Sequence, residues 1–90
     1  GAGVSRTELF VVEARGLRSS KTPRFFGENS EGRSVWTTTG WGTAPIVRFA
    51  TFEAAKRVAK EATIKHPSAH VFVVGRSEYI LTEEALRLRH

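Results

Sequence analysis

The run IVRFATFEAAKRVAKEA, residues 46–62, changes from the two-residue period of a strand to the period of about 3.6 residues of a helix. Its first residues, 46–49, are mostly branched or aromatic and favour a strand. From Thr51 onward apolar side chains recur on one face and charged side chains on the other, and the Thr51 hydroxyl is suited to cap the first turn. Pro67 cannot continue a helix. We therefore predict a strand over 46–49 and a helix from Thr51 to about residue 65 or 66.

Further strands and a second helix are expected around this run. Strand propensity is high in three other segments, 8–14, 35–39 and 70–75. The segment 40–45 contains two glycines and a proline and is typical of a turn, so 35–39 and 46–49 are expected to form a hairpin. Thr82, followed by two glutamates, is expected to cap a short C-terminal helix.

The expected fold is a small α+β domain. Its sheet is mainly antiparallel, with about four strands in the order β-loop-β-β-α-β, one helix packed on one face and a short C-terminal helix. We expect residues 4–90 to form this single domain, because a chain of 90 residues supplies one compact core. A long basic loop at 16–34 stands out in so small a domain.

The composition is basic and lacks cysteine. Fourteen lysines and arginines stand against nine acids, all glutamate, which gives a formal net charge of +5 and favours nucleic acid or an acidic protein surface as partner. The absence of cysteine excludes a disulfide scaffold and a thiolate metal site. No apolar run approaches the roughly 20 residues of a membrane span. We expect a cytoplasmic protein that makes no membrane contact.

The predicted sheet carries apolar side chains on both faces. The face toward the helix is expected to hold Phe10, Val12, Val47, Phe49, Val71 and Val73. The other face would carry Leu9, Val11, Phe72 and Val74. That second face must be covered, since it would otherwise be an exposed apolar patch. Three covers are available: the C-terminal helix, a second copy of the chain in a homodimer, or the loop 16–34 through Phe25 and Phe26.

The loop and its flanks contain the candidate binding residues. Cations surround two adjacent aromatic rings in this set, which comprises Arg15, Arg18, Lys21, Arg24, Phe25, Phe26 and Arg33. Cationic side chains neutralise phosphates and aromatic faces stack on unpaired bases, so the composition suits single-stranded nucleic acid. The structural alternatives are a solvated surface loop and a loop whose phenylalanines pack on the sheet.

Two further groups extend the candidate site. Lys56, Arg57 and Lys60 lie on the outer face of the predicted helix and add to the site if they join the loop in one patch. Trp41, between two glycines at the predicted hairpin tip, either packs back on the sheet or is available to a partner.

Residues for catalysis or metal binding are scarce. The chain has no aspartate and no cysteine, so the usual pairs of nucleophile and base are nearly absent. His66 and His70 have the i,i+4 spacing of helical metal ligands, but Pro67 lies between them and a solvated pair is expected. Gly40-Trp41-Gly42 lies between predicted strands, which is typical of a turn rather than of a phosphate-binding loop. We expect a protein that is not an enzyme and that needs no cofactor or metal.

The run from Ile46 to Ala55 combines a strand that ends in an aromatic residue, a threonine cap and an alanine-rich helix, and a return strand follows. This pattern resembles one found in small accessory proteins of bacteriophages and other mobile elements. The resemblance covers residues 35–75 and implies a non-enzymatic protein that binds a host factor or nucleic acid. It includes no motif with known functional residues, so it assigns no site.

Three functional hypotheses follow. In the first, a small basic protein engages nucleic acid, or a complex that handles nucleic acid, through the basic loop with help from the basic helix face. In the second, it is a protein-interaction module, for example an inhibitor of a host enzyme, that binds through Trp36, Trp41, Phe25 and Phe26. In the third, the second sheet face forms a homodimer with a structural role.

Overall fold

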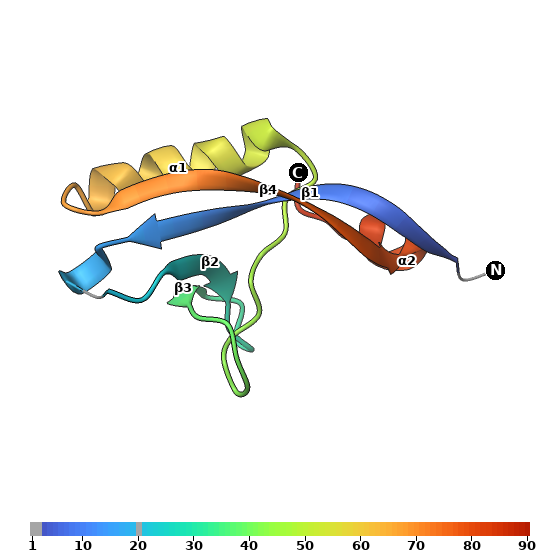
Figure 1. Ribbon diagram of the computed structural model, residues 1–90, viewed down its shortest axis with the longest axis horizontal. Coiled ribbons are helices and arrows are strands. Elements are labelled where there is room, and N and C mark those ends of the chain that lie inside the picture. Colours follow the sequence, from blue (N-terminus) through green and yellow to red (C-terminus); the bar gives the residue numbers. More distant parts are fainter. Residues whose placement is uncertain (1–2, 20) are drawn as a thin grey trace.

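The computed structural model of the chain describes residues 3–19 and 21–90 (Figure 1). The elements in chain order are β1 (Val4–Arg15), the 3-10 turn η1 (Leu17–Ser19), β2 (Arg24–Glu28), β3 (Ser34–Thr37), α1 (Phe52–Lys65), β4 (His70–Leu81) and α2 (Thr82–Ala85). The strands form a four-stranded antiparallel sheet in the order β3-β2-β1-β4. The predicted fold class, α+β with one main helix and a short C-terminal helix, is confirmed.

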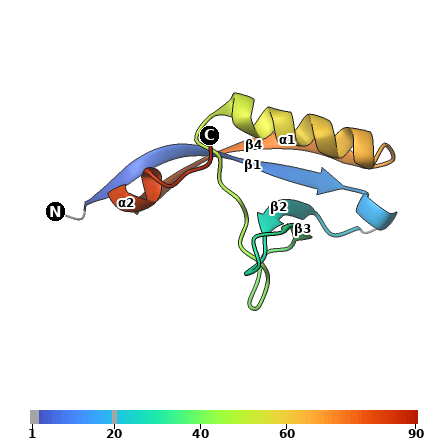
Figure 2. The ribbon, with the colours of Figure 1, turned by 180° about the vertical axis from the view of Figure 1, so that it is seen from behind.

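The sheet is built on a long two-stranded ribbon of β1 and β4. These strands pair along their whole length, from Val4 with Leu81 to Arg15 with His70, and both are longer than predicted. β2 pairs with only the last part of β1, and β3 pairs with β2. One half of the ribbon therefore lies between α1 on one side and β2 and β3 on the other, whereas the other half projects with α2 beside it (Figure 1, Figure 2).

The segment 16–34, predicted to be a loop, contains the turn η1 and the strand β2. Phe25 and Phe26 are consecutive residues of β2, and consecutive strand residues point to opposite faces of a sheet. Each ring therefore reaches a different core. The segment is therefore not a loop over its whole predicted length, because the adjacent phenylalanines belong to a short strand whose alternation is not visible among its polar neighbours.

The segment 46–49, predicted to be a strand, makes only isolated bridges, to Gly27, to Phe10 and to Arg89. The N–H of Val47 donates to Phe26 O of β2 at 2.9 Å, whereas Phe49 bonds to β1. The segment thus fills the space where β1 and β2 diverge. The hairpin predicted between 35–39 and 46–49 is wrong, and β3 pairs with β2 instead.

α1 begins and ends where the sequence predicts. Thr51 is the N-cap, its Oγ1 accepts from the N–H of Ala54 at 3.2 Å, and the helix ends at Lys65 before Pro67. The small buried side chains of Ala55 and its neighbours bring the helix close to the ribbon. The core beneath α1 includes all residues predicted for this face: Phe10, Val12, Val47, Phe49, Val71 and Val73.

The opposite face of the sheet is covered within the chain. Leu9 is 0% exposed and forms a second core with Val11 and Phe25, against which Ile46, Val74 and Leu88 pack. Of the three expected covers, the segment 16–34 contributes Phe25 and the C-terminal segment contributes Leu88. Leu9 therefore needs no second copy of the chain to leave water.

α2 is short and does not begin as predicted. The N-cap position is Leu81, and the hydroxyl of Thr82 donates to Gly3 O at 3.1 Å instead of capping the helix. Leu86, directly after α2, is exposed. Over the described residues, neither helix combines the length and the apolar character that crossing a membrane requires.

Candidate nucleic-acid interface

Five cations lie at one end of the molecule, which we call the basic end: Arg15, Arg18, Lys21, Arg24 and Lys65. They stand where β1 ends, in and after η1, where β2 begins and where α1 ends. These element termini meet at the end of the ribbon that carries the turn between α1 and β4 (Figure 1). Four of the five cations were predicted together from the sequence, and Lys65 was not part of that set.

Arg15 is the member of the basic end that already has a partner. Its Nε donates to Glu13 Oε2 at 2.8 Å, and its guanidinium lies 5.8 Å from the centroid of the Phe72 ring. The Glu13 side chain is only 11% exposed, so Arg15 neutralises a carboxylate that has largely left water. Arg15 therefore stabilises the fold, and the other cations are the better candidates for binding.

Arg18, Lys21 and Arg24 make no side-chain ion pair with any described residue. Arg18 has φ 51° and ψ 37°, a left-handed conformation that is costly for a residue other than glycine. The adjacent Leu17 is buried, which anchors this turn. The turn thus holds Arg18 exposed in a defined position.

A groove beside the basic end adds aromatic surface. It has a volume of about 320 Å³, and its lining includes Trp36 and Phe26 from the sheet and Lys65 and His66 from the end of α1. The rings of Trp36 and His66 meet edge to face, with centroids 6.3 Å apart. Sequence reasoning missed this groove because its two sides come from distant segments, and the expected strand position of Trp36 was the only signal for it.

Phe25 and Phe26, predicted to stack on bases, pack on opposite faces of the sheet, and Phe26 also lines the groove. Phe25 is 8% exposed in the core on one face. Phe26 packs on the other face against Trp36, at 5.9 Å between ring centroids, and against Phe49 at 6.2 Å. The predicted display of both rings on a mobile loop is wrong, and the alternative in which they pack on the sheet describes the structure.

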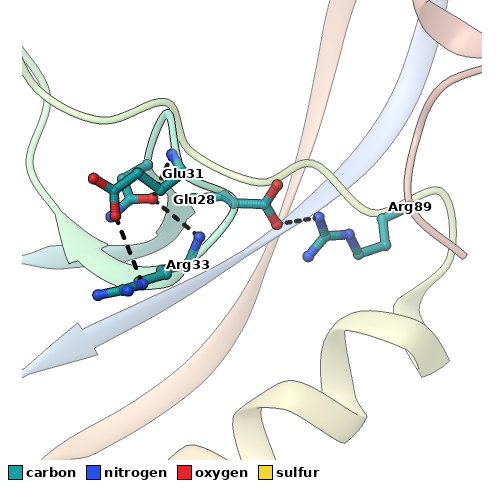
Figure 3. Close-up of polar contacts among 5 residues, drawn as sticks. Glu28, Glu31, Arg33 and Arg89 are labelled. Atoms are coloured by element: carbon teal, nitrogen blue, oxygen red, sulfur yellow. Dashed lines mark hydrogen bonds and ion pairs between the residues drawn. The ribbon is translucent and has the colours of Figure 1, made fainter.

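Arg33 lies at the other end of β2, away from the basic end. Its N–H donates to Asn29 Oδ1 at 3.0 Å, and its Nε is 3.7 Å from Glu31 Oε2 (Figure 3). Beside this turn, Arg89 Nη2 donates to Glu28 Oε2 at 2.6 Å. The structure therefore separates Arg33 from the cations with which the sequence grouped it.

Trp41 is fully exposed at the tip of the loop between β3 and the segment 46–49. The Thr43 hydroxyl donates to Gly40 O at 2.8 Å, and the Thr37 hydroxyl donates to Ala44 O at 2.8 Å. These bonds order both the tip and the base of the loop. Of the two expectations for Trp41, the structure excludes packing back on the sheet.

Lys56, Arg57 and Lys60 are exposed on the outer face of α1. Among the described residues, none of the three has an ion-pair partner. α1 runs toward the basic end, so these cations follow the helix that ends there (Figure 2).

A larger cleft of about 830 Å³ lies on the sheet face opposite α1. Charged residues from four segments line it: Arg48, Arg76, Arg87 and Arg89 with Glu28, Glu78 and Glu84. Arg48 Nε is 3.5 Å from Glu78 Oε2, and Arg89 is paired with Glu28. Because the acids nearly balance the arginines, this cleft lacks the excess positive charge of the basic end.

Over residues 3–19 and 21–90, no group of three or more potential ligand side chains is arranged to hold a metal ion. His66 and His70 instead lie against aromatic rings. The chain matches no protein-family model, and no curated protein or solved structure is significantly similar to it. Function is therefore inferred from the residues of the molecule itself.

Proposed function

We propose that the protein is a non-enzymatic binding protein for single-stranded nucleic acid. Phosphates contact the basic end, and an unpaired base enters the groove beside Trp36. The observation that carries the proposal is that Arg18, Lys21 and Arg24 share one end of the molecule with an aromatic groove that also contains Lys65.

The chemistry of the two parts is complementary. Lysine and arginine without acidic partners attract phosphates from any strand, independent of sequence. The groove, at about 320 Å³, has the size of a small ligand pocket and suits one flat ring system. Base stacking on aromatic side chains requires unpaired bases, so single strands are favoured over duplexes.

Trp36 supplies a direct reporter of binding. The chain contains two tryptophans, so a Trp41→Phe variant leaves Trp36 as the only one. We expect its fluorescence to change when short single-stranded DNA or RNA is added, because the base contacts or displaces solvent from the ring. The affinity should fall as salt concentration rises.

Removal of cations tests which surface is used. In the Trp41→Phe background, Arg18→Ala with Lys21→Ala should weaken binding several-fold and reduce the slope of log affinity against log salt by about one to two. Arg33→Ala with Arg87→Ala removes the same charge elsewhere and should leave the slope nearly unchanged. Equal losses in the two variants, or no binding to any single strand at low salt, would contradict the proposal.

A second candidate function rests on Trp41. A fully exposed tryptophan on a loop ordered by its own hydrogen bonds has the character of a protein-binding hot spot. We propose as the alternative that this loop binds another protein, with the basic charge accelerating encounter with an acidic surface. Trp41→Ala should then abolish co-purification of a partner, whereas Arg18→Ala with Lys21→Ala only weakens it.

A further inference from the structure

β4 is an edge strand whose outer backbone groups are free. Phe10 exchanges both backbone hydrogen bonds with Phe49, at 2.9 and 2.8 Å, so its N–H and C=O point away from β4. Its partner Gly75 must then direct its own N–H and C=O away from β1. By alternation the same outward direction holds for Val73, Ser77 and Tyr79. In the described part of the chain no backbone bond reaches these outward groups.

β4 lacks most of the features that usually prevent an edge strand from pairing with another strand. Edge strands are usually protected by shortness, proline, a bulge, charged side chains or a cover, and of these β4 has only the charges of Arg76 and Glu78. β4 has 12 residues, contains no proline and keeps a continuous register with β1. α1 packs on a face of the ribbon and reaches only its inner part (Figure 1).

We propose that a second copy of this chain pairs with this edge, with the two β4 strands antiparallel about a two-fold axis at Ser77. In this register residues at equal distances from Ser77 face each other. The two sheets then become one continuous sheet with the two β4 strands at its centre. This inference goes beyond nucleic-acid binding and does not depend on it.

Charge complementarity sets the register. With the axis at Ser77, Arg76 of each copy faces Glu78 of the other, in a pair whose Cα atoms approach to about 4.5 Å. Glu78 Oε2 is buried without a hydrogen-bond partner among the described residues, and Arg48 Nε lies 3.5 Å from it. Within one chain the Arg76 guanidinium lies 5.4 Å from the centroid of the Phe25 ring. In the dimer Arg76 would turn from this ring toward the edge and add a second cation to the Glu78 carboxylate of the other copy.

On the other face of the two paired β4 strands, large side chains of one copy lie opposite small ones of the second copy. Tyr79, 74% exposed, would face Gly75 of the second copy. Among the described residues, the Phe10 ring, at 3.5 Å, is the one group within 4 Å of the place where a Gly75 Cβ would lie, so a tyrosine ring can lie across it. Leu81, 44% exposed, would face Val73. This pairing therefore buries the exposed large side chains of the half of β4 that α1 leaves bare.

An alternative register is less favourable. With the two-fold axis at Gly75, Arg76 would face Val74 and Glu78 would face Phe72. Arg76 and Glu78 would then gain no partner from the second copy and would keep only their contacts within the chain, Arg76 with the Phe25 ring and Glu78 with Arg48. The axis at Ser77 also offsets the two α1 helices along the sheet, since each covers the half of β4 that lies away from the axis (Figure 2).

Charge reversal tests both the interface and its register. Light scattering of the purified full chain should give twice the 10.0 kDa chain mass. Arg76→Glu, and separately Glu78→Arg, should raise the dimer dissociation constant about tenfold or more, because like charges then meet twice. The double variant Arg76→Glu with Glu78→Arg should restore the dimer, since each pair is reversed. Arg87→Glu makes the same charge change outside β4 and should leave the dimer intact.

Hydrogen exchange on the unmodified protein gives a second test that no folding defect can disturb. The amides of Val73, Ser77 and Tyr79 should exchange more slowly as concentration rises, whereas those of Val74 and Arg76, bonded to β1, should not change. A monomer at the highest attainable concentration would overturn the proposal. So would a dimer that tolerates Arg76→Glu, a folded double variant that stays monomeric, or a monomer that pairs β4 only with an added extended peptide.

Discussion

The two halves of the β1–β4 ribbon belong to the same strands and the same ladder, yet they differ in burial. The inner half comprises 9–15 with 70–76, and the outer half comprises 4–8 with 77–81. Residues 11–14 of the inner half are all buried, whereas Ile80 is the one buried residue of the outer half. Backbone pairing is the same in both, so the difference comes from the elements that cover the inner half.

This difference in burial gives the two halves different roles: the inner half stabilises the fold, and the outer half leaves its surface available to a partner. On one face of the inner half lie α1 and the side chains of Phe26, Val47 and Phe49, and on the other face lie Phe25, Ile46 and Leu88. Most of the apolar area that drives folding is buried there. Apart from Ile80, the outer half contributes little burial. Most of its side chains and the outer backbone groups of 77–81 stay in water, which suits this half to bind rather than to stabilise.

The largest difference between the halves is expected from leucine truncation. Leu9→Ala in the inner half removes a 0% exposed side chain and should lower the free energy of unfolding by about 3 kcal/mol. Leu81→Ala in the outer half, at 44% exposure, should cost less than about 1 kcal/mol. Chemical denaturation at low protein concentration measures both. Similar losses would show that the outer half is as tightly packed as the inner one.

The next largest loss of stability is expected from Gly27→Ala, a substitution in β2, which is one of the elements that cover the inner half. A Cβ added at Gly27 would lie 2.5 Å from Pro45 O and 2.8 Å from Thr37 Cγ2. Because the first of these atoms is backbone, Gly27→Ala should lower the free energy of unfolding by about 1–3 kcal/mol.

Gly75→Ala is the matched control for this glycine change. The nearest atom to its added Cβ is Phe10 Cε1 at 3.5 Å, an ordinary contact. The free energy of unfolding should therefore change by no more than about 0.5 kcal/mol in thermal or chemical denaturation at low concentration. An unchanged stability for Gly27→Ala would mean that β2 and the segment 46–49 pack less closely than the structure describes.

The parts of the fold that could be predicted are those with a clear period. α1 and the side chains beneath it follow from the alanine stripe after Thr51 and from alternation in 8–14 and 70–75. β2 could not be predicted, because its period is carried by Phe25 and Phe26 alone and its flanks are polar. The segment 46–49 has strand propensity, but its place between diverging strands depends on tertiary contacts that no local pattern encodes.

The candidate site also has one part that could be predicted from local sequence and one part that could not. Arg15, Arg18, Lys21 and Arg24 are close in sequence, and a short turn keeps them at one end of the molecule. The groove beside them unites Trp36 with the end of α1, so it exists only once the helix has packed on the sheet. Of the two phenylalanines in the predicted set, Phe26 lines this groove, whereas Phe25 lies in the core on the opposite face of the sheet.

The smallest expected difference in stability is between alanine variants of one arginine from each half. Arg15 in the inner half pairs at 2.8 Å with Glu13, whose side chain is 11% exposed. Arg15→Ala should lower the free energy of unfolding by about 1–2 kcal/mol, because it leaves a mostly buried carboxylate without its partner. Arg6 in the outer half donates to Ser77 Oγ at 2.8 Å in an exposed contact, so Arg6→Ala should change the stability by no more than about 0.5 kcal/mol. The two variants lose the same charge, so net charge cannot explain a difference between them in denaturation. Equal losses would mean that water reaches Glu13 as readily as it reaches Ser77, and the covers over the inner half would then not exclude solvent.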